Sequence, residues 1–476
     1  MKPLLIGGEY LTTSSGTPNI NPSDTSDVID RFATAGVAET QAAIAAAADA
    51  APRWARTTPQ ERHDVLKTAG DEMMARRVEL GELLSREEGK ISAEGIAEAE
   101  RAARILDFFA GEALRQTGDI LGSARPGITV EVTREPVGVV GIITPWNFPL
   151  AIPAWKIAPA LCFGNAVVFK PAELVPSSAW ALVDILHRAG LPHGALNLVI
   201  GPGSVVGQTM LDDPSVDAVT FTGSVGTGRR VAAACMGRGA RVQLEMGGKN
   251  PLVVLDDADL DGAVEAAVNG AYFSTGQRCT ASSRLIVTEG IHSRFVEGVA
   301  ERLRALRVDH ALKDGTEMGP VVDEAQLAQN LSYVETARRE GGSLRTGGER
   351  LSRGTQGFYM SPALLTETTS AMTINREEVF GPVASVIRVR DYEEALSVAN
   401  DTEFGLTAGI CTTSLKHAAH FKRHAEAGMV MVNLPTAGVD YHVPFGGRKG
   451  SSYGPREQGS YAKEFFTIVK TAYTAP

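Results

Sequence analysis

Between residues 137 and 255 the chain alternates short apolar runs, rich in Val and Ile, with segments of helical character. Strands that are buried on both faces read as nearly continuous apolar runs, and parallel sheets covered by helices on both faces consist of such strands. This region therefore predicts a doubly wound α/β fold. The predicted strands lie at residues 137–144, 166–170, 196–200, 217–222, 242–245 and 252–255.

The remainder of the chain extends this pattern on both sides. Residues 36–116 are rich in Ala, Glu and Arg and predict amphipathic helices, and the α/β rhythm resumes from 256 to about 440. A strand is also predicted at 129–134, and the tail at 465–473 predicts one last strand. An isolated strand must pair with another one. The length of 476 residues agrees with two or three domains.

Composition and charge exclude several classes of protein. The formal net charge is −10 with acidic and basic residues interspersed, so a basic surface for nucleic acid is not expected. The four cysteines, Cys162, Cys235, Cys279 and Cys411, have neither disulfide-framework nor zinc-site spacing. The sequence shows no signal peptide and no apolar run of membrane-spanning length. We expect a cytoplasmic protein without a membrane partner or a metal ion.

One cysteine stands apart from the other three. Cys162, Cys235 and Cys411 lie in apolar or helical runs, where a free cysteine is usually a small buried hydrophobe. Cys279 follows a Gly-Gln-Arg sequence and predicts a partly exposed loop. The guanidinium of Arg278 favours a thiolate if it points toward the sulfur. Cys279 is therefore a candidate nucleophile.

Two polar residues next to predicted strands are candidate partners for this nucleophile. Glu245 ends a strand, at the sheet edge where parallel α/β folds bind ligands, although it could equally cap a turn. Asn147 lies between two prolines and could donate to an oxyanion, or be a plain turn residue. The histidines 417, 420 and 424 share a helical face, and the basic residues around them indicate a solvated surface instead of a metal site.

A strand, a glycine-rich turn and a helix follow one another at residues 221–230. The glycines are not spaced as G-x-G-x-x-G, so a tight structural turn is one interpretation. The other is an anion site, because a helix N-terminus offers free backbone N–H groups, to which Ser224 could add its hydroxyl. Lys170 and Glu173 close another predicted strand and place a cation and an anion at the same edge.

Taken together, these segments resemble the NAD(P)-dependent aldehyde dehydrogenase superfamily, and the resemblance covers essentially the whole chain. One departure is Met246, because Leu is commoner at this position in the family. Met and Leu are both apolar and similar in volume. The matching motifs occur in family order: Thr144–Pro149 (TPWNFP), Lys170–Glu173 (KPAE), Phe221–Ser224 (FTGS), Leu244–Lys249 (LEMGGK), Phe273–Cys279 (FSTGQRC), Glu377–Pro382 (EEVFGP) and Pro444–Gly447 (PFGG).

The resemblance implies a chemistry for three of these residues. Cys279 forms a thiohemiacetal with an aldehyde, and hydride transfer to nicotinamide leaves a thioester. The amide of Asn147 and the backbone N–H of Cys279 hold the oxyanion, and Glu245 activates the hydrolytic water. The presence of Glu245 favours hydrolysis over transfer to coenzyme A. The three residues together argue against a non-catalytic structural member of the fold.

The resemblance also implies how the cofactor is bound, with NAD expected and NADP possible. Lys170 and Glu173 bind the adenosine ribose, and Glu378 and Phe380 position the nicotinamide ribose and ring. The remaining cofactor residues are Trp146, which lines the cleft, and Gly223 and Ser224, which meet the pyrophosphate.

The family architecture implies two doubly wound α/β domains and a β oligomerisation element. The cofactor-binding domain comprises residues 1–117 and 137–248, the catalytic domain 249–440, and the oligomerisation element 118–136 and 458–476. We expect a homo-oligomer, either dimer or tetramer, in which the terminal strand pairs on a neighbouring subunit.

The substrate is suggested by residues 433–459, which resemble the same region of 2-oxoglutarate semialdehyde (2,5-dioxopentanoate) dehydrogenases. An anionic aldehyde needs a cation away from its carbonyl, and a guanidinium binds carboxylate in a bidentate way. Arg278 and Arg456 are the candidates, with Phe148 as an apolar contact, although Arg278 could instead form a structural salt bridge. Succinate semialdehyde, glutarate semialdehyde and sulfolactaldehyde are alternative substrates.

Overall fold

The computed structural model describes residues 1–476, and its first sheet contains the first five of the six predicted strands, whereas the run at 252–255 belongs to a strand of the second sheet. Five parallel strands run in the order β9-β8-β7-β10-β11, and their buried apolar side chains explain why they read as continuous Val-rich runs. Short antiparallel strands, β1, β2 and β21, complete both edges. The bounds are β1 Leu4–Ile6, β2 Glu9–Leu11, β7 Val139–Ile143, β8 Ala166–Lys170, β9 Leu196–Leu198, β10 Ala218–Thr222, β11 Arg241–Glu245 and β21 Ser452–Tyr453.

Helices cover this sheet and share a core of 69 buried residues with it. Helix α5 is buried along its whole length, which agrees with its almost entirely apolar sequence. The amphipathic helices predicted within residues 36–116 are α1 to α4. The bounds are α1 Val37–Trp54, α2 Pro59–Ala75, α3 Arg77–Glu88, α4 Ser92–Ala113, α5 Ala151–Cys162, α6 Pro176–Arg188, α7 Gln208–Asp212 and α8 Val225–Gly237.

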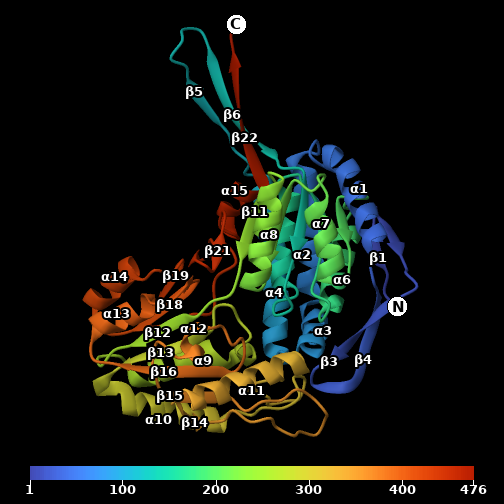
Figure 1. The fold of residues 1–476 in the computed structure, drawn as a ribbon. Coiled ribbons are helices and arrows are strands. Elements are labelled where there is room, and N and C mark those ends of the chain that lie inside the picture. The colour runs from blue at the N-terminus through green and yellow to red at the C-terminus, as the bar shows by residue number, and fades with distance from the viewer.

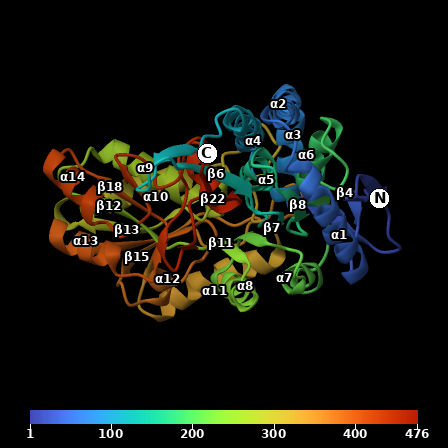
Figure 2. The same cartoon turned by 90° about the horizontal axis from the view of Figure 1, so that it is seen from above.

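A second sheet lies beside the first, with its own helices (Figures 1 and 2). Its order is β14-β15-β16-β13-β12-β18-β19, and all neighbours are parallel except β14 and β15. The strands are β12 Asn250–Val254, β13 Ser282–Thr288, β14 Ser343–Thr346, β15 Ala363–Thr368, β16 Val383–Val389, β18 Thr407–Cys411 and β19 Met429–Val432. The helices are α9 Leu260–Tyr272, α10 Glu289–Ala305, α11 Glu324–Arg339, α12 Thr373–Arg376, α13 Tyr392–Asn400 and α14 Leu415–His424.

A three-stranded arm projects from this body and contains the C-terminus (Figure 1). It consists of β5 Asp119–Gly122, β6 Thr129–Pro136 and the terminal strand β22 Thr467–Thr474. Strand β22 pairs along its length with β6 of the same chain, and its other edge has no neighbour within the chain. The expectation that it also pairs on a neighbouring subunit stays a prediction. The short helix α15 Lys463–Phe466 anchors Phe465 and Phe466 in the first core and so starts β22 beside the end of β6.

The other elements are small. Strands β3 Gly16–Asn21 and β4 Asp24–Ala33 form a hairpin, and β17 Phe404–Gly405 pairs with β20 Arg448–Lys449. None of the helices combines the length and the apolar character that a membrane crossing requires.

Candidate active site

The carboxyl edge of the first sheet collects most of the predicted site residues. Glu245 is the last residue of β11 and lies opposite Thr222 of β10, and Lys170 is the last residue of β8 and lies opposite Ile143 of β7. Because β8, β7, β10 and β11 are consecutive neighbours, the loops that follow them meet at one edge. Those loops contain Trp146 and Asn147 after β7, and Gly223 and Ser224 after β10.

The second sheet contributes the cysteine loop, which joins α9 to β13. Ser274, Thr275 and Gly276 are consecutive residues with left-handed backbones, with φ of 52°, 56° and 65°. Such conformations are strained for non-glycine residues and persist where the surroundings fix them. A Cβ on Gly276 would lie 2.2 Å from the Gly381 carbonyl oxygen. Glycine is therefore required there by a close backbone approach, and the turn presents Cys279.

Cys279 lies at the junction of two cavities. One cavity, of about 310 Å³, is also lined by Trp146, Ser224 and Phe380. The other, of about 280 Å³, is also lined by Phe148, Arg101 and Arg278. Cys279 therefore borders both cavities: the larger one contains the expected cofactor residues, and the smaller one contains guanidinium groups.

The surroundings of the sulfur favour the neutral thiol. Burial, together with the nearby carboxyl groups of Glu378 and Glu245, raises the pKa of Cys279 to about 12. The guanidinium of Arg278 does not offset this effect, because it pairs with Glu94, with 3.4 Å between Nη2 and Oε1. The thiolate stabilisation expected from Arg278 is therefore not supported, and the nucleophile needs a base.

Glu245 is a buried carboxyl group in a setting suited to accept a proton. Its Oε2 accepts a hydrogen bond of 2.5 Å from the Ser452 hydroxyl. Burial and the carboxyl group of Glu457 raise the pKa of Glu245 well above its ordinary value, against opposing effects of Ser452 and Lys156. Glu457 is itself buried, one of its oxygens pairs with Lys156, and the other has no hydrogen-bond partner.

Sequence reasoning did not find Lys156 and Glu457. The Lys156 ammonium also donates to the Thr220 hydroxyl, at 2.7 Å, beneath the sheet edge. A single lysine within the otherwise apolar sequence of α5 was the available signal, since a buried lysine is rarely left unpaired. Glu457 gave no comparable signal, because it is one of many acidic residues in loops.

Asn147 is buried between the two sheets. Its side-chain amide donates to the backbone oxygen of Gln277, with 2.9 Å between the atoms, and so faces the cysteine loop. Its own backbone oxygen accepts a hydrogen bond of 2.7 Å from the Lys90 ammonium. The amide has a second N–H, and Asn147 lines the same cavity as Cys279.

The larger cavity has features that fit a dinucleotide. Phe380 has a φ of 60° and its ring meets Trp146 edge to face, with 5.4 Å between centroids. The Glu378 carboxylate accepts a 2.9 Å hydrogen bond from the Gly248 N–H, and burial raises its pKa to about 7. The Glu378 carboxylate also packs closely on Gly247, since a Cβ at that position would lie 2.1 Å from a Glu378 oxygen. Ser224 caps α8 without a side-chain hydrogen bond to the helix backbone, since its hydroxyl donates to the Thr227 hydroxyl at 3.1 Å, and this leaves the helix N–H groups for an anion.

Lys170 and Glu173 lie beyond this cavity, two strands from Ser224. The Lys170 ammonium donates to the Pro171 carbonyl at 2.9 Å and lies 3.8 Å from a Glu173 oxygen. Burial lowers the pKa of Lys170. The two residues thus lie outside the cavity that Cys279 lines.

The smaller cavity contains a guanidinium that sequence reasoning missed. Arg101, on α4, donates from Nη2 to the Gln458 side chain at 3.2 Å, and its Nε is buried without a partner. The Nε of Arg278 is likewise buried and unpartnered, as is the Trp155 indole N–H. The spacing of Glu94, Glu98 and Arg101 on one helix face would have indicated a charged cluster.

Arg456 occupies a different place from the one expected. Its guanidinium donates to the Gly447 carbonyl oxygen, and its charge acts on Glu245. It is not among the residues that line the smaller cavity, so a substrate contact is not supported for it.

The three histidines of α14 pack against Tyr392 or one another, and the His417 ring stacks on Tyr392 with 4.5 Å between centroids. His420 and the Tyr392 hydroxyl are 2.7 Å apart, and the rings of His420 and His424 stack with 3.8 Å between centroids. No cluster of three or more His, Cys, Asp or Glu side chains with metal-binding geometry occurs in residues 1–476.

Comparisons with known proteins agree with this geometry. The family model described as "Aldehyde dehydrogenase family" matches residues 11–472. The alpha-ketoglutaric semialdehyde dehydrogenase of Bacillus subtilis is 44% identical, over 99% of this chain and 97% of that protein. The alpha-ketoglutarate semialdehyde dehydrogenase of Haloferax volcanii is 41% identical, over 98% of both chains.

A solved structure extends the comparison to three dimensions. The betaine aldehyde dehydrogenase of Staphylococcus aureus, crystallised in complex with NAD+, superposes with a TM-score of 0.97 at 32% identity, over 100% of this chain and 95% of that one. The fold, the motifs in their order and these matches lead to one conclusion: the chain belongs to the aldehyde dehydrogenase family.

Proposed function

We propose that the protein oxidises 2-oxoglutarate semialdehyde to 2-oxoglutarate with NAD, through a thioester on Cys279. The observation that carries this proposal is the position of Cys279 between two cavities, one with the cofactor motifs and one with two guanidinium groups. The names of two relatives, at 44% and 41% identity, support the choice of substrate.

In the first half of the reaction Cys279 attacks the aldehyde carbon. Solvent hydroxide takes the thiol proton, and the buried Glu245 carboxyl group is kept for the water of the second half, since its raised pKa suits it to hold a proton. The free N–H of the Asn147 amide and the backbone N–H of Cys279 stabilise the oxygen of the thiohemiacetal. When bound, NAD accepts a hydride from the substrate carbon, which leaves a thioester on the sulfur.

In the second half Glu245 removes a proton from the water that attacks the thioester. The unpartnered oxygen of Glu457 lies within the same buried group and can receive that proton, with Lys156 holding its other oxygen. The carboxylate product leaves, and Cys279 returns to the thiol that its raised pKa favours.

The anionic end of the substrate lies in the smaller cavity. Arg101 and Arg278 each keep one buried N–H without a protein partner, and a carboxylate satisfies such donors. The Trp155 indole N–H, also unpartnered, donates to the 2-oxo group, and Phe148 forms an apolar wall. This arrangement explains why three buried donors remain unpaired in the chain alone.

The cofactor residues support NAD more than NADP. Glu173 accepts hydrogen bonds from ribose hydroxyls and repels a 2′-phosphate, and the Lys170 ammonium, 3.8 Å from a Glu173 oxygen, offsets this repulsion only in part. The adenosine end extends to these residues from the cavity lined by Trp146, Gly223, Ser224, Glu378 and Phe380.

We further propose the division of the chain that the family architecture implies. Residues 1–117 and 137–248 form the cofactor-binding domain, 249–440 the catalytic domain, and 118–136 with 458–476 the oligomerisation element. The outer edge of β22 has no neighbour within the chain, and Val469 and Tyr473 are exposed on it, which supports a dimer or tetramer. Four free cysteines support a place in the cytoplasm.

A second candidate substrate is betaine aldehyde, which carries a quaternary ammonium group. The solved structure of that dehydrogenase is very similar in fold, and Glu94, Glu98 and Trp155 line the smaller cavity. Arg101 and Arg278 oppose a cation in the same space. The smaller cavity would need positive groups to bind 2-oxoglutarate semialdehyde and negative or aromatic groups to bind betaine aldehyde.

The test is an aldehyde panel with purified protein, measured by formation of NADH and NADPH. The panel contains 2-oxoglutarate, succinate and glutarate semialdehydes, sulfolactaldehyde, betaine aldehyde and pentanal. We expect the highest kcat/KM for 2-oxoglutarate semialdehyde with NAD. A higher value for betaine aldehyde or for pentanal would overturn the anionic substrate.

A further inference from the structure

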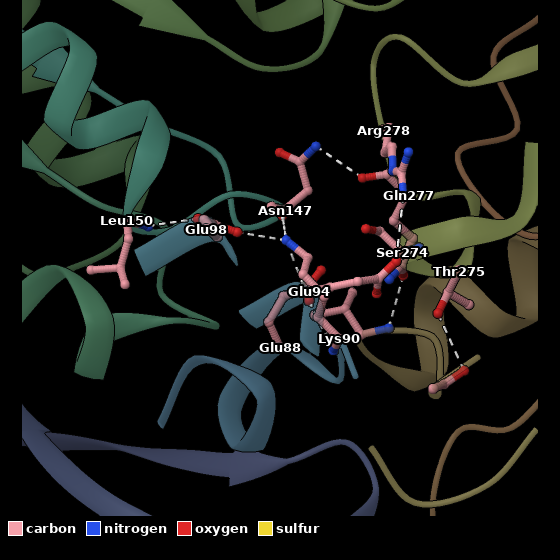
Figure 3. A network of polar contacts seen from close by, with 12 residues as sticks. Glu88, Lys90, Glu94, Glu98, Asn147, Leu150, Ser274, Thr275, Gln277 and Arg278 are labelled. Carbon is pink, nitrogen blue, oxygen red and sulfur yellow. Dashed lines mark hydrogen bonds and ion pairs between the residues drawn. The ribbon is translucent and has the colours of Figure 1, made fainter. Parts of the chain in front are cut away.

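The loop between α3 and α4 places a buried ammonium group directly behind the oxyanion residue (Figure 3). The side chain of Lys90 is only 1% exposed, and its Nζ donates to the backbone oxygen of Asn147 and to Glu98 Oε2, both at 2.7 Å. The same Nζ lies 3.8 Å from the centroid of the Phe148 ring. Lys90 therefore contacts two successive residues of the Asn147 turn.

Glu98 holds the other end of the same turn. Its second oxygen, Oε1, accepts hydrogen bonds from the backbone N–H groups of Leu150, at 2.9 Å, and Ala151, at 3.1 Å. These are the first N–H groups of α5, which would otherwise be unpaired and buried. The Lys90–Glu98 pair thus fixes residues 147–151 at both ends.

The opposite wall of the site is held from the same helix. Glu94, one turn before Glu98, accepts a 2.8 Å hydrogen bond from the backbone N–H of Ser274 and pairs with Arg278 (Figure 3). Ser274 begins the strained turn that presents Cys279. Helix α4 therefore provides a common support for the amide donor and for the nucleophile, although these come from different sheets.

Burying the Lys90–Glu98 ion pair costs free energy, because both charges are withdrawn from water. Two charges withdrawn from water are stabilised only when their remaining hydrogen bonds are satisfied, and replacing such a pair by apolar residues often leaves stability unchanged. Here both oxygens of Glu98 and the ammonium of Lys90 are engaged, and their side-chain hydrogen bonds, apart from the one between them, go to the Asn147 turn. The ammonium also lies 3.9 Å from a Glu88 oxygen, a longer ion pair. The hydrogen bonds of the pair therefore serve to hold the Asn147 turn in place.

We propose that Lys90 and Glu98 are positioning residues, which hold the Asn147 amide at the place where it stabilises the oxyanion. The inference rests on the role given to Asn147 in the proposed function. Neither residue exchanges a proton or touches the reacting atoms. Both side chains border the smaller cavity, but their side-chain hydrogen bonds go to each other and to the Asn147 turn, so we expect their effect on the reaction to pass through Asn147.

A double-mutant cycle tests this dependence, with Lys90→Met, Asn147→Ala and the double variant. The measurement is the single-turnover rate of NADH formation with whichever panel aldehyde the wild type uses best. In the otherwise unchanged chain, we expect Lys90→Met to lower this rate by about 10- to 100-fold. This loss is smaller than the one expected when an oxyanion donor is removed altogether. In the Asn147→Ala background the same change should cost less than about twofold.

Two readouts separate positioning from general damage to the fold. NAD affinity and the alkylation rate of Cys279 by iodoacetamide should stay within about twofold of the wild type in Lys90→Met, because neither uses the oxyanion donor. Lys67→Met, which removes an exposed ammonium that pairs with Asp71, is the matched control and should leave all rates unchanged.

If Lys90→Met does not fold, Glu98→Gln tests the same proposal. The glutamine retains an oxygen for the two α5 N–H groups but loses the charge that orients Lys90. We expect a smaller loss, of about 3- to 10-fold, that again disappears in the Asn147→Ala background.

Three outcomes overturn the proposal. Full additivity of either variant with Asn147→Ala shows that the pair acts elsewhere, and wild-type rates in both Lys90→Met and Glu98→Gln show that it does not act at all. A wild-type rate in Asn147→Ala alone removes the oxyanion assignment of the proposed function, and the positioning role falls with it. The first two outcomes leave the proposed function intact.

Discussion

Replacing Glu245 by glutamine should separate the two halves of the reaction. The side chain is buried, accepts a 2.5 Å hydrogen bond from Ser452, and lies close enough to Glu457 for that group to raise its pKa. Glutamine has nearly the same volume, and its carbonyl oxygen can still accept the Ser452 hydrogen bond. The substitution therefore removes the ability to take a proton and little else.

The magnitude follows from what a buried base supplies. General-base catalysis contributes roughly 10²- to 10⁴-fold, which corresponds to about 3–5 kcal/mol. Because water attacks the thioester only with help from a base, the full loss should fall on hydrolysis. Acylation should suffer less, because a thiol with a pKa of about 12 gains reactivity from solvent hydroxide as the pH rises.

The assay is stopped-flow measurement of NADH with enzyme at high concentration. We expect a burst of about one NADH per active site in Glu245→Gln, followed by turnover slowed by at least about 100-fold. In the wild type, turnover should increase with pH through the raised pKa of Glu245, since the ionised form is the base, and the variant should lack this dependence. Equal loss of burst rate and turnover, without accumulation, would show that Glu245 acts on Cys279 before the thioester forms.

The other predictions concern the nucleophile, the anion site and the cofactor. Cys279→Ser should lower turnover by about 10³-fold or more while NAD binding, measured by titration, persists, and near-normal rates would exclude the thioester mechanism. Arg101→Leu and Arg278→Ala should each lower kcat/KM for 2-oxoglutarate semialdehyde by about 10- to 100-fold, the value of a charged hydrogen bond, but that for pentanal by less than about threefold. Equal losses for both aldehydes would remove the anion site. Glu173→Gln should raise kcat/KM with NADP relative to NAD, and an unchanged ratio would show that Glu173 does not select the cofactor.

The sequence predicts the strands of the first sheet well, because their burial on both faces leaves a local apolar signal. Strand β8 agrees with the predicted range of 166–170, and β10 and β11 differ from theirs by one residue. The short antiparallel edge strands β1, β2 and β21 leave no such signal, because two or three residues pair only through the tertiary fold. The pairing of β22 with β6 leaves no local signal for the same reason, since β6 lies more than 300 residues earlier.

The same distinction applies to the candidate site. Asn147 and Glu245 are detectable because each follows or ends a strand at the ligand edge, and Cys279 because of its polar loop. Lys156 and Glu457, which are 301 positions apart, become a buried pair only when the tail folds over α5. Lys90 and Arg101 look like ordinary charges of a helical region in the sequence, and only the packing of α4 against both sheets shows their direction.

The central claim is that the substrate is joined to Cys279 as a thioester before water releases it. The direct measurement mixes Glu245→Gln with 2-oxoglutarate semialdehyde and NAD, quenches with acid during the slow phase, and analyses the protein by intact and peptide mass spectrometry. We expect one acyl group of the substrate per chain, on the peptide that contains Cys279, and none when NAD is omitted. Formation of NADH without this acyl group, or an acyl group on another residue, would contradict the mechanism.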